Sequence, residues 1–189
     1  MSVRPILQIG DPGLRRVADP VPPDEIDAPW VRQLVDDLID TMRDADGAGL
    51  AATQIGEPWR IAVMEVTQNP RYPYKPPIPL TVAINPTVEP FDDEMVDINE
   101  GCLSVPWRGV VARHVNVRVR YLDRDATPHD DVRRGLTAGT WQHECDHLDG
   151  IVFADRADPS TFTTWDNFER FHRAAFVDRI TAFVERVGS

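Results

Sequence analysis

The sequence predicts a single domain that combines helices with strands, and three observations support this prediction. The chain has 189 residues, which suffice for one hydrophobic core but are few for two domains. Apolar residues recur at helical spacing near both ends of the chain and alternate with polar residues in between. The segment around His143 carries two histidines at helical spacing. We therefore expect one domain over residues 1–189.

The composition argues against nucleic-acid-binding, exported and membrane-spanning proteins. A formal net charge of -11 argues against a nucleic-acid-binding protein, because contacts to phosphates need a basic face. The N-terminus has neither signal-peptide nor transit-peptide character, and no apolar stretch is long enough to span a bilayer. Two cysteines without an export signal are typical of a reducing compartment. We expect a cytoplasmic protein that binds neither nucleic acid nor membranes.

The first part of the chain predicts an arm, a helix and a close-packed turn. Proline and glycine turn signals in residues 1–23 indicate an extended arm laid on the domain. Apolar residues at helical spacing predict a helix over Ala28–Asp46, which Gly47 ends. The run of small residues that follows, Gly47–Gln54, lets the backbone approach another group closely. The alternative for this run is a loop with a buried turn.

Strands are predicted in the middle of the chain. Arg60–Val66, Leu80–Asn85 and Val110–Leu122 have the composition and alternation of strands. The proline-rich segment Asn69–Pro79 indicates an exposed loop, either a connector or a rim of the site. Asp123–Arg134 is interpreted as a polar turn region.

The end of the chain predicts a short strand and a long helix. Ile151–Phe153 is a short apolar strand candidate. Residues 160–187 are expected to form an amphipathic C-terminal helix. Its inner stripe would consist of Phe168, Phe171, Ala175, Ile180, Phe183, Val184 and Val187.

The segment WQHECDHLDG, residues 141–150, carries the strongest chemical signal. On a helix, His143 and His147 lie on one face a turn apart, where two imidazoles can hold one metal ion. Glu144 follows about 100° round the helix, which suits a proton acceptor for a metal-activated water. This pattern favours a metal-dependent hydrolase. The alternative is a helix that carries two histidines by chance.

A catalytic metal usually has three protein ligands, so one ligand is missing from this helix. Phe153 occupies the position at which one protease pattern has its third histidine, and it cannot bind metal. Glu169 and Glu185 are available downstream without supporting context. Cys102, in the upstream segment EGCLSVP, is the better candidate, because a thiolate binds zinc or ferrous iron strongly. Cys145 lies two residues from each histidine, points away from the metal and is interpreted as packing.

Three segments, GAGLAATQ, EGCLSVP and QHECDHLDG, occur in this order and together resemble the signature motifs of peptide deformylases. The resemblance extends from the arm near Pro5 to about Ala154. It implies an α+β fold with mixed and antiparallel strands around a central metal-binding helix, and the C-terminal helix of the bacterial form. The pattern of elements above agrees with that fold.

The resemblance also implies the metal site. Cys102, His143 and His147 match the family's metal ligands, and Glu144 matches its general acid and base. One divalent metal per chain is expected, with Fe²⁺ in the cell and Zn²⁺, Ni²⁺ or Co²⁺ as substitutes.

The substrate-facing groups follow from the same motifs. Gln54 and the backbone N–H of Leu103 match the oxyanion donors, and Gly49 and Gly101 match backbone positions that contact the substrate peptide. For the slot that receives methionine, we expect Ala48, Ile98 and the space over Gly139 and Thr140.

The implied activity is removal of the N-formyl group from the formylmethionine of newly synthesised proteins, with release of formate. The expected partners are N-formyl-Met nascent peptides, with a transient ribosome contact. Two rival functions remain open at this point. One is a metallo-endopeptidase that uses the same helix, and the other is a structural metal site, which would need Cys145 as a fourth ligand.

Overall fold

The computed structural model describes residues 2–67 and 74–189 of the chain. Its helical segments, which include short 3-10 turns and one π turn (η4), are η1 (Pro12–Arg15), α1 (Pro29–Asp44), η2 (Ala52–Ile55), α2 (Gly135–Leu148), α3 (Phe153–Arg156), η3 (Pro159–Thr161), α4 (Trp165–Asn167), η4 (Phe168–His172) and α5 (Arg173–Val187). Its strands are β1 (Gly49–Ala51), β2 (Ile61–Val66), β3 (Ile78–Pro90), β4 (Met95–Cys102), β5 (Val105–His114), β6 (Asn116–Leu122), β7 (Pro128–Arg134) and β8 (Thr163–Thr164).

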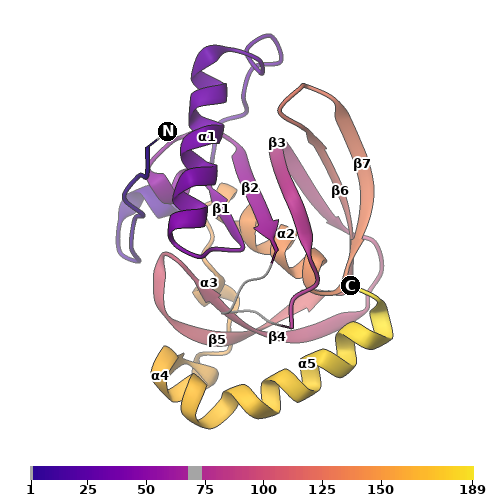
Figure 1. The fold of residues 1–189 in the computed structure, drawn as a ribbon. Helices are drawn as coiled ribbons and strands as arrows, with labels where there is room; N and C mark the ends of the chain where they lie inside the picture. The colour runs from indigo at the N-terminus through magenta and orange to yellow at the C-terminus, as the bar shows by residue number, and fades with distance from the viewer. Residues whose placement is uncertain (1, 68–73) are drawn as a thin grey trace.

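The strands form two antiparallel sheets (Figure 1). The larger sheet has the strand order β1-β2-β3-β6-β7, and the smaller has the order β4-β5-β8. Val63 and Met64 are consecutive in β2 and therefore point to opposite faces of the larger sheet. Val63 packs with Leu38 of α1, and Met64 packs with Trp141 of α2. The two helices thus cover opposite faces, and the predicted α+β class is confirmed.

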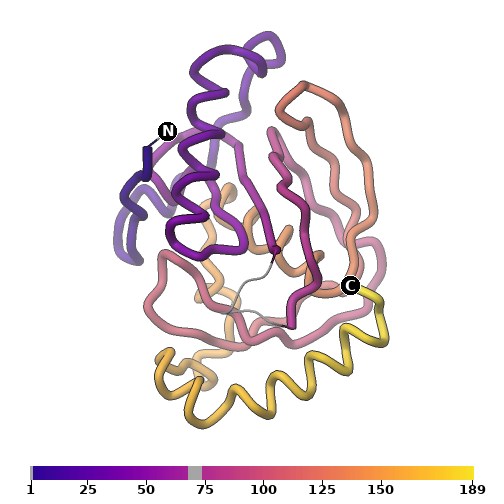
Figure 2. The backbone as a smooth tube through the Cα atoms, in the orientation of Figure 1, coloured from indigo at the N-terminus to yellow at the C-terminus, as the bar shows by residue number. Residues whose placement is uncertain are grey.

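The histidine helix α2 is central in the fold. Besides the larger sheet, it reaches the smaller sheet and α5, because Leu136 of α2 shares a hydrophobic cluster with Ile98 of β4 and Ile180 of α5. The C terminus returns to the start of this helix (Figure 2), where the Ser189 hydroxyl donates to the Arg134 carbonyl at 3.0 Å. Residues of α2 are therefore held from several sides.

The N-terminal arm contains one 3-10 turn at Pro12–Arg15 that the sequence did not predict. It lies against two of the three motif segments. The Leu7 N–H donates to the Gln54 carbonyl and the Ile9 N–H donates to the Ser104 carbonyl, both at 2.8 Å. The arm thus ties the motif segments to each other.

The first predicted helix is confirmed as α1, but its predicted end at Gly47 is wrong. The helix ends at Asp44, and Asp46 takes the left-handed conformation with φ of 51° that a glycine usually supplies. Gly47–Gln54 is also more ordered than a loop, since it contains β1 and most of η2.

The single strand predicted over Val110–Leu122 is wrong. It is split between β5 and β6, which belong to different sheets, and Val115 forms the bend between them. Val115 is itself buried, so buried and exposed residues go on alternating through the bend. The alternation in the sequence therefore gives no sign that the strand ends there. β6 then pairs with β3, whereas β5 pairs with β4.

Three further predictions of local structure need correction. The polar segment Asp123–Arg134 contains the edge strand β7, which has no buried side chain and therefore no strand-like apolar pattern. Ile151–Phe153 is not a strand, because Phe153 begins the helix α3. Of the proline-rich loop, residues 69–73 lie outside the described residues, and Ile78 and Pro79 already belong to β3.

The C-terminal segment is not one continuous helix over residues 160–187. It contains η3, β8, α4, a π turn at Phe168–His172 and then α5. A π turn inserts one residue into the helical period, so the buried stripe shifts by one position after it. Phe176 is buried in place of Ala175, and Phe171 is 61% exposed. The predicted inner stripe is therefore wrong at Phe171 and Ala175.

Candidate active site

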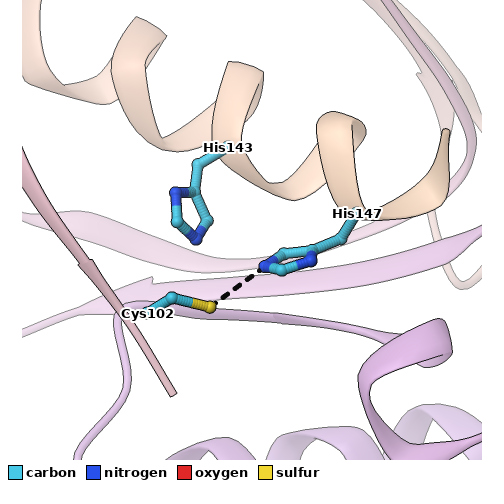
Figure 3. A group of neighbouring side chains, drawn as sticks. All are labelled: Cys102, His143 and His147. Atoms are coloured by element: carbon cyan, nitrogen blue, oxygen red, sulfur yellow. Dashed lines mark hydrogen bonds between the residues drawn. The ribbon is translucent and has the colours of Figure 1, made fainter. Parts of the chain in front are cut away.

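The structure brings Cys102, His143 and His147 together (Figure 3). Their ligand atoms all lie within 4.8 Å of one another, and Cys102 Sγ lies 3.2 Å from His147 Nε2. The two imidazoles come from successive turns of α2, whereas the thiol comes from the end of β4. In the part of the chain that the structure describes, no other group of three such side chains has this geometry.

The position of Cys102 follows from the β4–β5 hairpin. The register shifts between Gly101 and Cys102, and Cys102 then pairs with Val105 across a tight turn. Such an irregularity re-aims a side chain, and here the thiol points toward α2. The Ser104 N–H donates to Sγ at 3.3 Å and the Gln54 amide donates to it at 3.6 Å. These donors stabilise a negative charge on the sulfur.

The thiol is prepared to act as a thiolate. Burial alone raises the pKa of Cys102, but the nearby His147 and His143 side chains lower it to about 5. Metal ligands must be deprotonated, so a thiol with a low pKa is a better ligand than an ordinary cysteine.

His143 is oriented by a buried hydrogen-bond network of charged side chains. Its Nδ1 lies 2.9 Å from Glu100 Oε2, and Arg113 donates to both carboxylate oxygens of Glu100, at 2.7 and 3.0 Å. Although burial raises the pKa of Glu100, Arg113 lowers it to about 2, so the carboxylate stays charged. Asp146, which precedes His147 in α2, accepts from Arg113 and Arg156 instead. The hydrogen bond to Glu100 leaves His143 Nε2 for a metal.

Glu144 lies beside the ligand cluster and is 4% exposed. Its Oε2 is buried and has no hydrogen-bond partner among the described residues, and burial raises the pKa of the carboxyl group. Gly49 makes room for it, because a Cβ on Gly49 would lie 2.2 Å from Oε1. The carboxylate therefore faces the cleft in a position where it can accept a proton.

Gly49→Ala should displace the Glu144 carboxylate while the metal ligands stay in place. A misplacement of about 1 Å typically costs roughly 100-fold, so we expect kcat to fall by that order with unchanged metal content. If the effect acts through Glu144, it should be nearly absent in a Glu144→Gln background. A full additional loss in the double variant would show that Gly49 acts in another way.

A cleft of about 690 Å³, its open mouth included, surrounds these groups. It is lined by all the remaining residues that the sequence assigned to substrate or oxyanion contacts. These are Ala48, Gly49, Gln54, Ile98, Gly101, Leu103, Gly139 and Thr140. Their proximity is established by the structure, and their roles stay predictions.

Sequence reasoning missed two basic residues of this cleft. Arg108 is buried between the rings of Trp165 and Phe168, with its guanidinium carbon 4.5 and 4.2 Å from their centroids. Arg108 pairs with Gly101 across the hairpin, so a correct strand register would have found it. Lys75 donates to the Thr140 hydroxyl at 2.8 Å, and burial lowers the pKa of its ammonium group to about 8. No local sequence pattern links Lys75 to α2.

The donor set fits a catalytic metal better than a structural one. One thiolate and two imidazoles make three ligands, whereas a structural site closes with four. Cys145 does not supply the fourth, since it lines a separate groove with Arg60 and Arg156. Burial raises the pKa of Cys145 to about 12, which keeps it a thiol. The unpartnered oxygen of Glu144 marks where a water or substrate can bind.

Comparison with known proteins decides between the remaining functions. Residues 3–163 match the family model described as Polypeptide deformylase. The chain belongs to the peptide deformylase family. It is 46% identical to peptide deformylase 2 of Ralstonia nicotianae over 160 residues, which cover 84% of this chain and 89% of that protein.

Solved peptide deformylases share the fold. The class I type b enzyme of Acinetobacter baumannii with bound Met-Ala-Ser is 38% identical, with a TM-score of 0.79 over 82% of this chain and 98% of that one. An enzyme from Legionella pneumophila is 32% identical, with a TM-score of 0.72 over 98% of this chain and 99% of that one. The latter match therefore includes the C-terminal segment.

The protein is thus a metal-dependent hydrolase that removes the N-formyl group from the N-terminal formylmethionine of newly synthesised proteins. The metallo-endopeptidase alternative is not favoured. No helix in the described ranges has the length and apolar character needed to cross a membrane.

Proposed function

We propose that this peptide deformylase binds its metal through Cys102, His143 and His147, and that Glu144 moves the proton. The observation that carries the proposal is the cluster of three ligand atoms within 4.8 Å, with the buried and unpartnered oxygen of Glu144 beside it. When bound, the ion supplies a nucleophile at neutral pH, because it strongly lowers the pKa of water.

Glu144 takes the proton of the attacking water and later gives it to the departing amine. The burial that raises the pKa of Glu144 brings this group closer to neutral pH, where a carboxyl group exchanges protons efficiently. Gly49 keeps space for its carboxylate, because any side chain at this position would collide with it.

Gln54 and the Leu103 N–H are assigned to the developing oxyanion. The Gln54 side chain is fixed at its other end, where its Oε1 accepts from the Ala51 N–H at 2.9 Å. This contact directs the amide nitrogen toward the Cys102 and Ser104 side chains. Removal of one such donor typically raises the activation barrier by about 3 to 4 kcal/mol. The Gln54→Ala variant should therefore release formate slowly but still bind metal.

The substrate is a peptide that begins with formylmethionine. We assign the methionine slot to Ala48, Ile98, Gly139 and Thr140, which all line the cleft, and the peptide backbone to the segments of Gly49 and Gly101. The peptide Met-Ala-Ser bound to the relative from Acinetobacter baumannii supports a substrate of this class. The same proposal includes a cytoplasmic location and a transient contact with the ribosome, because newly synthesised formylated chains emerge from the ribosome.

One thiolate and two imidazoles suit ferrous iron as well as zinc, and we assign Fe²⁺ as the metal in the cell because the resemblance to peptide deformylases favours iron. A thiolate beside ferrous iron is exposed to oxidation, so activity should decay in air and persist with nickel or with reductants. An enzyme equally active and stable in air with zinc would contradict the iron assignment.

The test of function is formate release by protein purified without oxygen and loaded with metal. We expect release from formyl-Met-Ala-Ser much faster than acetate release from acetyl-Met-Ala-Ser, because the metal side of the cleft holds little more than a formyl group. Comparable rates on both peptides, or cleavage at an internal peptide bond in preference to either, would contradict the proposal.

A further inference from the structure

The hydrogen-bond network behind His143 continues past Glu100 to the protein surface. Arg113, which donates to Glu100, also donates through its other terminal nitrogen to Asp146 Oδ2 at 2.6 Å. Arg156 in turn donates to both carboxylate oxygens of Asp146, at 2.8 and 2.7 Å. Carboxylates and guanidiniums therefore alternate from the predicted metal ligand to Arg156.

The inner members of this network are buried, and Arg156 forms its outer end. Glu100, Arg113 and Asp146 are 8%, 2% and 7% exposed, whereas the side chain of Arg156 is 45% exposed. A buried carboxylate is costly unless it has hydrogen bonds and an opposite charge. Glu100 and Asp146 share Arg113, and one guanidinium cannot balance two carboxylates. Arg156 supplies the second positive charge.

The short helix α3, which ends at Arg156, also contacts the metal site at its first residue. Phe153 is 1% exposed, and its ring is inclined by 19° to the imidazole of His143, with ring centroids 6.3 Å apart. Between the two, Asp155 forms an ion pair with Arg15 of the N-terminal arm, which fixes α3 to the domain. The two ends of α3 thus support the same histidine, one through its ring and one through the network.

We propose that Arg156 is a positioning residue for the metal site. It balances the charge of Asp146 and so keeps Arg113 directed at Glu100. Glu100 in turn fixes the ring of His143. The direct partner of a ligand histidine typically contributes about 10- to 100-fold to metal affinity. Arg156 lies further out and is partly exposed, so we expect about 3- to 10-fold. This inference rests on the proposed function, because it takes His143 as a metal ligand.

The test measures zinc affinity by competition with a chelator, starting from the metal-loaded protein. Arg156→Gln should weaken Zn²⁺ binding by about 3- to 10-fold relative to the wild type. Arg156→Lys keeps the positive charge but lacks the planar fork that contacts both oxygens, so it should recover part of the loss. Unchanged affinity in Arg156→Gln, or an equal loss in Arg156→Lys, would overturn the proposal.

Arg15→Gln is the matched control for these variants. Arg15 pairs with Asp155 on the same short helix, and its side chain is 48% exposed, close to the value for Arg156. Its removal leaves the partners of Asp146 in place, so zinc affinity should stay within about twofold of the wild type. An equal loss of affinity in Arg15→Gln and Arg156→Gln would show that loosening of α3 is the cause, and would overturn the proposal.

A double variant identifies the route of the effect. If Arg156 acts through the carboxylate of Asp146, Arg156→Gln should cause no further loss of zinc affinity in an Asp146→Asn background. A full additional loss would contradict this route. If the metal-loaded wild type releases no formate from formyl-Met-Ala-Ser, the proposed function itself fails, and the zinc affinities still decide the role of Arg156 separately.

Discussion

Replacing Glu144 by glutamine should leave one metal per chain and lower kcat for formate release by about 100-fold or more. Glutamine keeps the size of the side chain and removes the group that accepts the proton. Because Glu144 is not among the three clustered ligands, metal content should not change. Elemental analysis and steady-state kinetics on the same preparation check both statements.

Glu169→Gln is the matched control for this variant. Glu169 pairs with Arg173 on the exposed C-terminal segment, and its side chain is 56% exposed. We expect wild-type activity and metal content, since surface ion pairs contribute little. Loss of metal together with activity in Glu144→Gln would instead identify Glu144 as a ligand and would contradict its assignment as the proton shuttle.

Cys102→Ala should lose both metal and activity. Loss of an outer hydrogen-bond partner of a metal site typically costs about 10- to 100-fold in metal affinity, and loss of a direct ligand should cost more. We therefore expect less than stoichiometric metal after gel filtration and formate release at background. Metal analysis of the eluted protein checks this expectation.

Cys145→Ala separates the ligand role from a general need for cysteine. Cys145 is also buried, but it lies on the side of α2 that faces the groove with Arg60 and Arg156. This variant should retain metal and most of its activity, at some cost in stability from the lost packing. Full metal content in Cys102→Ala, or metal loss in Cys145→Ala, would contradict the assigned ligand set.

The parts of the site that lie within one helix could be predicted from the sequence. The spacing of His143 and His147 fixes their common face, because helical geometry is local. Cys102 was reached only through the EGCLSVP motif, since its approach to the histidines depends on the β4–β5 hairpin. The bend at Val115, which separates the two sheets, leaves no local signal because Val115 is as buried as its neighbours in the pattern.

Other parts of the cleft depend on contacts between distant segments. Lys75 reaches Thr140 across 65 positions of the chain. The aromatic cover of Arg108 depends on the C-terminal segment, in which the π turn moved the buried stripe from Ala175 to Phe176. A buried stripe predicted from the sequence assumes a constant helical period. A residue inserted by a π turn therefore makes the predicted stripe wrong beyond that point.

X-ray absorption of the zinc-loaded protein tests the ligand assignment most directly. We expect one sulfur at about 2.3 Å from the metal, with the remaining neighbours nitrogen or oxygen at about 2.0 to 2.2 Å. The sulfur should persist in Cys145→Ala, since Cys102 remains. A shell without sulfur, or a shell with two sulfurs, would contradict the account in which Cys102, His143 and His147 hold the catalytic metal.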